Sequence, residues 1–162
     1  MWWSRRSAFL GLLAVAGCGF TPVYAPDSTA STLRDAVQIT APETVEGYAM
    51  LQALRDRLGN AATPAYALTV TLDITEVAAA TTTEGNTTRY TLPGEATYVL
   101  NNVAGITLTQ GTVASFTSYS ATGTTVATST AQADARARLA QLLADQIVTR
   151  LSVADLTPQL TP

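Results

Sequence analysis

The residue best placed to do chemistry is Cys18, the single cysteine among 162 residues. It follows Val15, Ala16 and Gly17, which are one apolar residue and two small ones. This is the spacing of a lipobox, in which the preceding residues are cut off, the thiol carries a diacylglycerol and the new amino group carries a third acyl chain. Each buried CH₂ contributes roughly 0.8 kcal/mol, so three chains would anchor a protein stably. A lone cysteine in a signal peptide can also be inert, but its place at the end of an apolar run favours lipidation.

Residues 1–17 have the pattern of a secretory signal peptide. The basic pair Arg5-Arg6 precedes an apolar run from Ala8 to Ala16 that ends in small residues. This run is too short to span a bilayer. The pair also resembles a twin-arginine export signal, although Phe9 comes one residue late for that motif. The sequence therefore predicts export and leaves both export routes open.

The residue after the cysteine carries a sorting signal. Gly19 stands where an aspartate would resemble the inner-membrane retention signal of many lipoproteins. We therefore expect sorting to the outer membrane, with the folded domain facing the periplasm.

Composition excludes several kinds of site. The chain has no histidine and no lysine, so it lacks the commonest general base and the commonest metal ligand. With Cys18 used for lipid, no disulfide and no thiolate metal site remains. Without residues 1–17, seven basic residues stand against twelve acidic ones, a net charge of -5. Such an acidic chain is a poor candidate for nucleic acid, which needs a basic stripe. We expect no metal and no cofactor.

The charged residues suggest no catalytic pair. Asp73 and Glu76 lie three apart on an expected strand, so they would point to opposite faces. Arg136 and Arg138 lie two apart on an expected helix and would diverge into solvated positions. The sequence therefore predicts no catalytic residue and no enzyme.

One arginine has a candidate binding role. Arg89 begins an expected strand beside Tyr90, in a stretch with little positive charge. A guanidinium there could bind a phosphate or carboxylate with two hydrogen bonds. The alternative is a solvated arginine at the end of a strand.

The first part of the mature chain is expected to form a tether, a strand and a helix. Residues 18–32 contain two prolines and a Ser/Thr run, which argue against regular structure. The alternation of Leu33, Val37 and Ile39 predicts a short strand that ends at Pro42. A helical stripe then follows the capping-box spacing of residues 40–43, and Gly59-Asn60 closes it. The stripe consists of Tyr48, Leu51, Leu54 and Leu58.

Three strands and a helix should follow. The period changes to two over residues 66–75, and alternation resumes from Tyr90 to Leu100 across Pro93-Gly94, which would mark a bulge or an edge position. A further strand contains Ile106, Leu108, Phe116 and Tyr119, and its phase slip near Gly111 predicts a β-bulge. The last helix runs from Ala131 to Leu151. Its apolar stripe consists of Ala135, Leu139, Leu142, Leu143, Ile147 and Leu151.

These elements predict an α+β fold in one domain, residues 33–151, followed by a mobile tail, residues 152–162. The last three strands can pair as a meander, and the first returns through a helix, which makes it parallel to its neighbour. The result is a two-layer sandwich in the order β-α-β-β-β-α. Two helices pack on one face of a four-stranded mixed sheet, and the other face is rich in threonine.

The chain resembles the LptE lipoproteins of alphaproteobacteria. The resemblance starts in the lipobox and proline-aromatic segment Cys18-Gly19-Phe20-Thr21-Pro22-Val23-Tyr24. It continues in the helix Leu51–Leu58, the tyrosine-led strand Tyr66–Val70 and the Ala/Arg-rich helix Ala133–Ala140. The family fold, two helices on a four-stranded sheet, agrees with the order derived above.

The resemblance implies a non-enzymatic outer-membrane lipoprotein that plugs the lumen of the LptD β-barrel and assists its assembly. The pair would place lipopolysaccharide in the outer leaflet, and the lipoprotein could bind lipopolysaccharide itself. Because this chain has no lysine, the basic residues that some members use are not transferred to it. The alternative is a stand-alone lipoprotein facing the periplasm that binds a small ligand or scaffolds the envelope.

Overall fold

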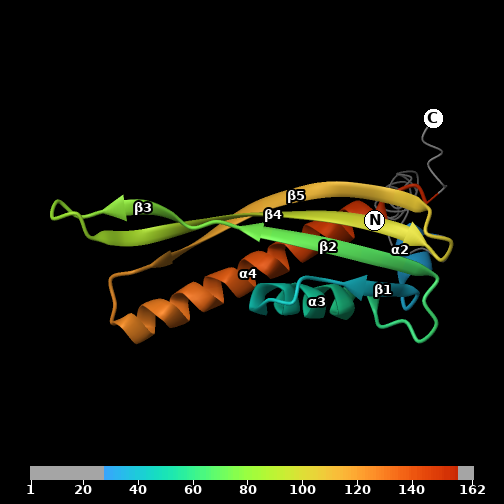
Figure 1. Ribbon diagram of the computed structural model, residues 1–162, viewed down its shortest axis with the longest axis horizontal. Helices are drawn as coiled ribbons and strands as arrows, with labels where there is room; N and C mark the ends of the chain where they lie inside the picture. The colour runs from blue at the N-terminus through green and yellow to red at the C-terminus, as the bar shows by residue number, and fades with distance from the viewer. Residues whose placement is uncertain (1–27, 157–162) are drawn as a thin grey trace, which may run out of the picture.

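The computed structural model describes residues 28–156, in which three helices and five strands form a two-layer α+β sandwich (Figure 1). The expected fold class is therefore confirmed. In chain order the elements are α2 (Thr29–Leu33), β1 (Val37–Thr40), α3 (Val45–Leu58), β2 (Tyr66–Ile74), β3 (Val77–Thr81), β4 (Thr87–Asn102), β5 (Thr107–Ser120) and α4 (Thr125–Ser152).

The sheet is mixed, as expected from the order of the elements. β1 pairs parallel to β2, and β2 and β5 pair antiparallel to β4. β3 was not expected; it pairs with Thr87–Thr91 of β4, whereas β2 pairs with Gly94–Asn102. β2 and β3 thus occupy the same side of β4, and the sheet is four strands wide although it contains five. The run Val77-Ala78-Ala79-Ala80 shows no alternation, so it gave no strand signal.

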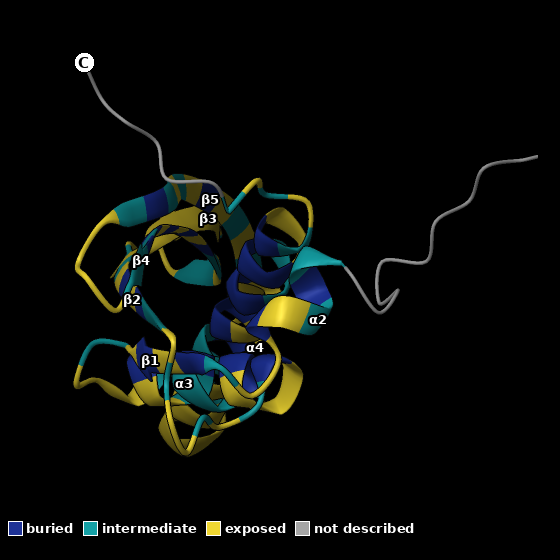
Figure 2. Ribbon diagram, turned by 90° about the vertical axis from the view of Figure 1, so that its right-hand side faces the viewer, coloured by how far each residue is buried: buried dark blue, intermediate teal, exposed yellow. Residues whose placement is uncertain are grey.

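The core lies between the sheet and the helices α3 and α4. The sheet curves around α4 (Figure 2), and the buried residues of its strands form one core with those of α3 and α4. Its inner face contributes Leu68, Val70, Leu92, Ala96 and Leu100. All of the predicted α4 stripe is buried except Leu142, which is 44% exposed.

The start of the domain differs from the expected tether and strand. Residues 29–33 form the short helix α2, and β1 begins only at Val37. Ser28 caps α2, because its side chain accepts a hydrogen bond from the Ser31 N–H. Ala30 and Leu33 are buried, so packing against the domain stabilises one helical turn in a Ser/Thr-rich segment.

The two long helices begin elsewhere than the sequence suggested. α3 is capped by Thr44 and not by residues 40–43, and Tyr48 is exposed while Met50 and Ala53 are buried. Its C-terminal cap at Gly59 is confirmed, with φ +81° and an N–H that donates to the Arg55 carbonyl. α4 begins at Thr125, six residues before the predicted start at Ala131. The sequence missed these first turns because they are polar and exposed and carry no apolar stripe.

The bulge predicted near Gly111 is wrong in position, and of the two alternatives for Pro93-Gly94 the structure shows no bulge. β4 and β5 stay in register through Pro93, Gly94 and Gly111, and the irregularity lies between Leu100 and Asn101. Pro93 instead stands at the break between β2 and β3, where the Thr75 N–H donates to its carbonyl at 3.1 Å. Because the β2 ladder ends at Gly94 and the β3 ladder starts at Thr91, the missing N–H of Pro93 falls in the gap between them and interrupts neither, which is the edge position that was the other expectation.

Candidate interaction surfaces

The outer face of the sheet carries rows of hydroxyl groups, as the alternation in β2 predicted. Thr71 lies opposite Thr97, which lies opposite Thr112. The hydroxyls of Thr97 and Thr112 are 3.1 Å apart, and all three side chains are exposed. Figure 1 looks onto this face, with α4 behind the sheet. No described helix covers this face.

Two carboxylates stand side by side on the same outer face. Asp73 of β2 pairs directly with Glu95 of β4, and both line a hollow of about 280 Å³ together with Pro93 and Ser115. Like charges in this position are unfavourable for the sheet. Within residues 28–156 no group of three or more metal-ligating side chains occurs, so the pair has no third protein ligand there.

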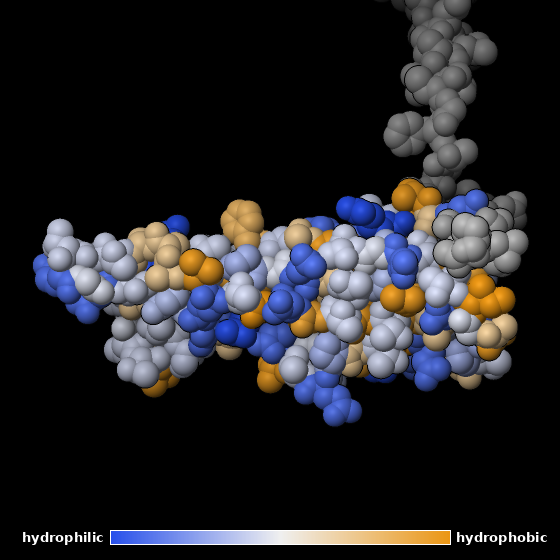
Figure 3. Space-filling view, turned by 45° about the horizontal axis from the view of Figure 1, so that its top comes forward, coloured by the Kyte–Doolittle hydropathy of each residue, from blue (hydrophilic) through white to orange (hydrophobic). Residues whose placement is uncertain are grey.

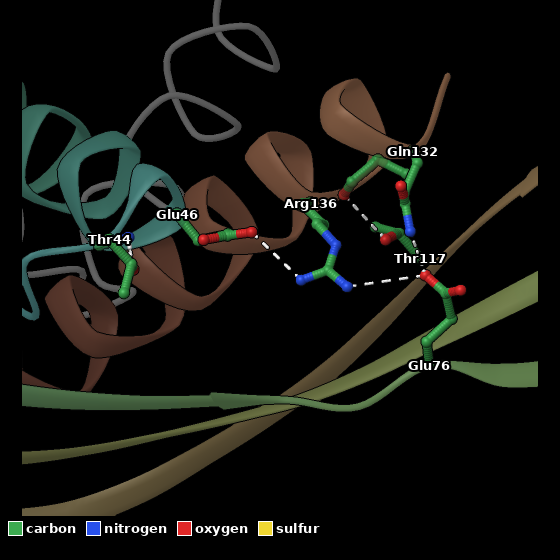
Figure 4. A network of polar contacts seen from close by, with 8 residues as sticks. Thr44, Glu46, Glu76, Thr117, Gln132 and Arg136 are labelled. Atoms are coloured by element: carbon green, nitrogen blue, oxygen red, sulfur yellow. Dashed lines mark hydrogen bonds and ion pairs between the residues drawn. The ribbon is translucent and has the colours of Figure 1, made fainter. Parts of the chain in front are cut away.

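Arg136 occupies the junction of the two layers (Figure 4). Its guanidinium lies 3.2 Å from the Glu46 carboxylate of α3 and 3.6 Å from that of Glu76, between β2 and β3. Gln132 donates to Glu76 at 2.6 Å. The expectation of a solvated Arg136 is therefore wrong, whereas Arg138 pairs on the surface with Asp134 of its own helix. Glu76 and Asp73 turn to opposite faces, as expected.

Tyr119 packs beside this junction. Its ring stacks on Tyr90, with centroids 5.3 Å apart and an interplanar angle of 17°. Burial raises the pKa of the Tyr119 hydroxyl, and the neighbouring Glu76 carboxylate adds to the rise. These groups hold the start of β3 against α4.

A groove that sequence reasoning missed lies between the end of β1 and the start of α3. It has a volume of about 790 Å³ and a mainly apolar lining. Val45 and Tyr48 expose 82% and 62% of their surface there. Ile39, Pro42 and Leu51 complete its apolar walls. The assignment of Tyr48 to the core stripe hid this groove from the sequence.

The remaining predicted site residues do not meet at one place. Arg89 is exposed on β4, opposite Ser120 and Ala80, and its side chain has no hydrogen bond or ion pair within the described range. Arg89 can therefore still be either a binding residue for a phosphate or carboxylate or a solvated strand residue. Cys18 and Gly19 lie outside the described residues. Of the helices that the structure describes, none is long and apolar enough to cross a membrane.

Comparison with known proteins gives both a family and related folds. The model of the lipopolysaccharide-assembly family LptE matches residues 34–151. A lipoprotein structure from Caulobacter crescentus is similar, with a TM-score of 0.62 and 23% identity over 76% of this chain and 92% of that one. Rare lipoprotein B from Shewanella oneidensis has a TM-score of 0.56 and 12% identity, with 72% and 92% covered. At these identities the likeness shows the fold. A comparison with curated proteins found no significant match.

Proposed function

Because the chain belongs to the LptE family of lipopolysaccharide-assembly proteins, we propose that it is the lipoprotein that plugs an LptD-like outer-membrane barrel and assists its assembly. The family match over residues 34–151 gives the chain a role in lipopolysaccharide transport and outer-membrane assembly. The finer role, as a plug, rests on the physical character of the outer face.

The outer face suits the inside of a barrel. Lumens of large outer-membrane barrels are polar, and a plug must be wet on the side that meets them. The Thr71–Thr97–Thr112 row offers hydroxyls that can donate and accept. No charge occurs between Glu95 and Asp134, so β5 and much of β4 can meet a polar wall without desolvating ions.

The anchor belongs to the same proposal. Lipid on Cys18 and sorting through Gly19 would bring the domain to the outer membrane, where the barrel assembles. Cys18→Ala should leave a precursor that is soluble or held at the inner membrane. Unchanged outer-membrane fractionation of that variant would mean that barrel contacts, and not lipid, hold the protein.

Co-purification tests the plug most directly. Tagged chain from detergent-solubilised outer membranes should carry a large barrel protein with it in constant ratio. Thr97→Arg, which places a charge in the hydroxyl row, should lower that ratio. Arg55→Gln, a change on the exposed side of α3, should not. Recovery of the tagged chain without any large barrel would contradict the proposal.

Contact with lipopolysaccharide is a separate part of the proposal. An exposed guanidinium without a protein partner in the described range, as at Arg89, fits a lipid phosphate. Arg89→Gln should reduce the lipopolysaccharide retained by the purified chain, and Arg150→Gln at the end of α4 serves as the matched control. Equal retention by both variants would leave Arg89 as a solvated strand residue.

The apolar groove favours a second function, a stand-alone lipoprotein that binds a small ligand. Its volume of about 790 Å³ is in the range of small-molecule sites. Depletion separates the two functions. Loss of surface lipopolysaccharide and of folded barrel supports the plug, whereas normal lipopolysaccharide export after depletion supports the ligand-binding protein.

A further inference from the structure

Two turns at opposite ends of β4 share one backbone geometry. In the β3–β4 turn the Gly85 N–H donates to the Thr82 carbonyl at 3.0 Å, and Gly85 has a φ of +87°. In the β4–β5 turn the Gly105 N–H donates to the Asn102 carbonyl at 2.9 Å, and Gly105 has a φ of +79°. The side chains that the two turns carry can therefore be compared position by position.

The residues at matched positions of the two turns differ in polarity. The β3–β4 turn carries Thr83, Glu84 and Asn86, which are polar and exposed. In the β4–β5 turn Val103 takes the place of Thr83, and Ile106 that of Asn86. Val103 exposes 80% of its surface and Ile106 exposes 46%. Because the same turn forms with polar side chains, these two aliphatic side chains serve no purpose in forming it.

The apolar turn lies at the end of the domain where the described chain begins. Val37, Tyr66 and Asn102 stand side by side across the sheet, where β1 and β2 begin and β4 ends. α2 directly precedes β1, and its Thr29 hydroxyl donates to the carbonyl of Ala154, just beyond α4, at 3.1 Å. Figure 1 accordingly shows α2, the β4–β5 turn and the C-terminal end of α4 at one end of the domain.

The lipid anchor of the proposed function brings this end close to a membrane. Residues 18–27 join Cys18 to Ser28 at the start of α2, and ten residues span at most about 35 Å. β4 alone has 16 residues and is about 50 Å long. The β3–β4 turn therefore lies farther from α2 than the lipid can reach, whereas the β4–β5 turn lies near the bilayer that holds the lipid.

Charge favours the same end of the domain. Between residues 28 and 156 seven arginines stand against eleven acidic residues, so an anionic membrane surface repels most of the domain. The β4–β5 turn and the loop between α3 and β2 contain no charged residue. Val153, which directly follows α4 at this end, exposes 77% of its surface. Figure 3 shows hydrophobic side chains (orange) at the right-hand end of the domain, so a bilayer meets least resistance there.

We propose that the apolar tip of the β4–β5 turn, Val103 and Ile106, inserts into the boundary between headgroups and acyl chains of the bilayer that holds the lipid anchor. The Asn102 side chain accepts hydrogen bonds from the Ala104 and Ile106 N–H groups, both at 2.9 Å. These backbone groups are thus satisfied inside the turn and lose nothing where water is scarce. The domain then has two contacts with the bilayer, which restrict its orientation more than a lipid alone does. This inference rests on the anchor of the proposed function and not on the barrel.

Tryptophan fluorescence tests the insertion, because Trp2 and Trp3 both precede Cys18 and the mature chain has no other tryptophan. Val103→Trp and Thr83→Trp place one probe at the same position of the two turns. Each full chain, purified with its lipid, is reconstituted in vesicles of phosphatidylethanolamine and phosphatidylglycerol that contain no barrel. Brominated acyl chains should quench the emission of Val103→Trp several-fold more than that of Thr83→Trp. Aqueous acrylamide should quench the two variants in the reverse order.

The second residue of the apolar tip is tested in the same backgrounds. Ile106→Asn gives the β4–β5 turn the residue that the β3–β4 turn has at this position, and should lower the quenching of Val103→Trp by lipid. Asn86→Ile, the opposite exchange, should leave Thr83→Trp exposed to water, because that turn lies away from the anchored end. Circular dichroism shows that each variant folds. Unchanged quenching after Ile106→Asn in a folded chain would contradict insertion of the tip.

Three results of the vesicle experiment would overturn the proposal. Equal quenching by lipid at both turns would mean that the domain lies flat on the membrane. No quenching at position 103 would mean that the tip stays in water. A blue shift of Val103→Trp that occurs only in complex with a barrel would assign the tip to a protein partner. An intact mass without acyl chains would overturn the inference through its premise, whereas failed co-purification with a barrel changes none of these readouts.

Discussion

The two faces of the sheet come from the same strands and differ in almost every property. The inner face presents Leu68, Leu92 and Leu100, which are fully buried against α3 and α4. The outer face presents threonines, two adjacent carboxylates and one exposed phenylalanine, and no described helix covers it. Strand alternation thus separates two tasks, because packing constrains every second residue and leaves the others free to suit a partner.

The largest loss of stability should come from truncating a side chain in the core. Leu143 of α4 is fully buried, so Leu143→Ala removes methyl groups and leaves a cavity in the core. We expect a loss of about 2–5 kcal/mol in the free energy of unfolding, measured by urea denaturation. The neighbouring Leu142 is 44% exposed, and Leu142→Ala should cost less than about 1 kcal/mol. Similar losses from both variants would contradict the observed orientation of α4.

A smaller loss of stability should follow from adding a methyl group to the tightly packed inner face of the sheet. A Cβ on Gly94 would lie 2.8 Å from Cδ2 of Leu139, which is itself fully buried. Gly94→Ala should therefore destabilise the domain by about 1–3 kcal/mol. Adding Leu139→Ala should give a double variant less destabilised than the sum of the two singles, since each change offsets the other. Strict additivity would show that the two side chains do not compete for space.

The sequence predicted which residues face the core better than it predicted where the helices and strands begin. In β2 and α4 the periodicity reports burial directly, because residues that face the core must be apolar. The assignment of Tyr48 to the core was wrong because this first residue of the stripe faces the groove, whereas Leu54 and Leu58 of the same stripe are buried. The assignment of Leu33 to a strand was wrong because alternation over a few residues cannot distinguish a strand from a capped helical turn.

The junctions between elements were the part of the site that sequence could not give. Arg136 meets Glu46 and Glu76, which are 90 and 60 positions away along the chain. Spacing along a helix says nothing about such partners. The apolar groove is likewise formed by a strand end, a loop and a helix start, so no single periodic segment reports it.

Removing the Arg136 ion pairs, which link the two layers, should have an intermediate effect on stability. Arg136→Met leaves Glu46 and Glu76 facing each other without a counter-charge, and we expect a loss of about 1–2 kcal/mol that shrinks in high salt. Arg138→Met breaks an exposed pair on one helix and should cost only about 0.5 kcal/mol. Urea denaturation at low and high salt measures both. Equal costs would mean that the Arg136 contacts contribute no more than a surface pair.

The smallest effect on stability should come from the outer face. Thr97→Val keeps the side-chain shape and the β-branch while removing the hydroxyl that meets Thr112, so the free energy of unfolding should change by less than about 0.5 kcal/mol. If this face contacts a partner through its hydroxyls, the same substitution should lower barrel co-purification although the domain is as stable as before. A loss of stability above about 1 kcal/mol would instead show that the hydroxyl row holds the sheet together. Stability unchanged with recognition impaired is the result that only a surface kept for a partner produces.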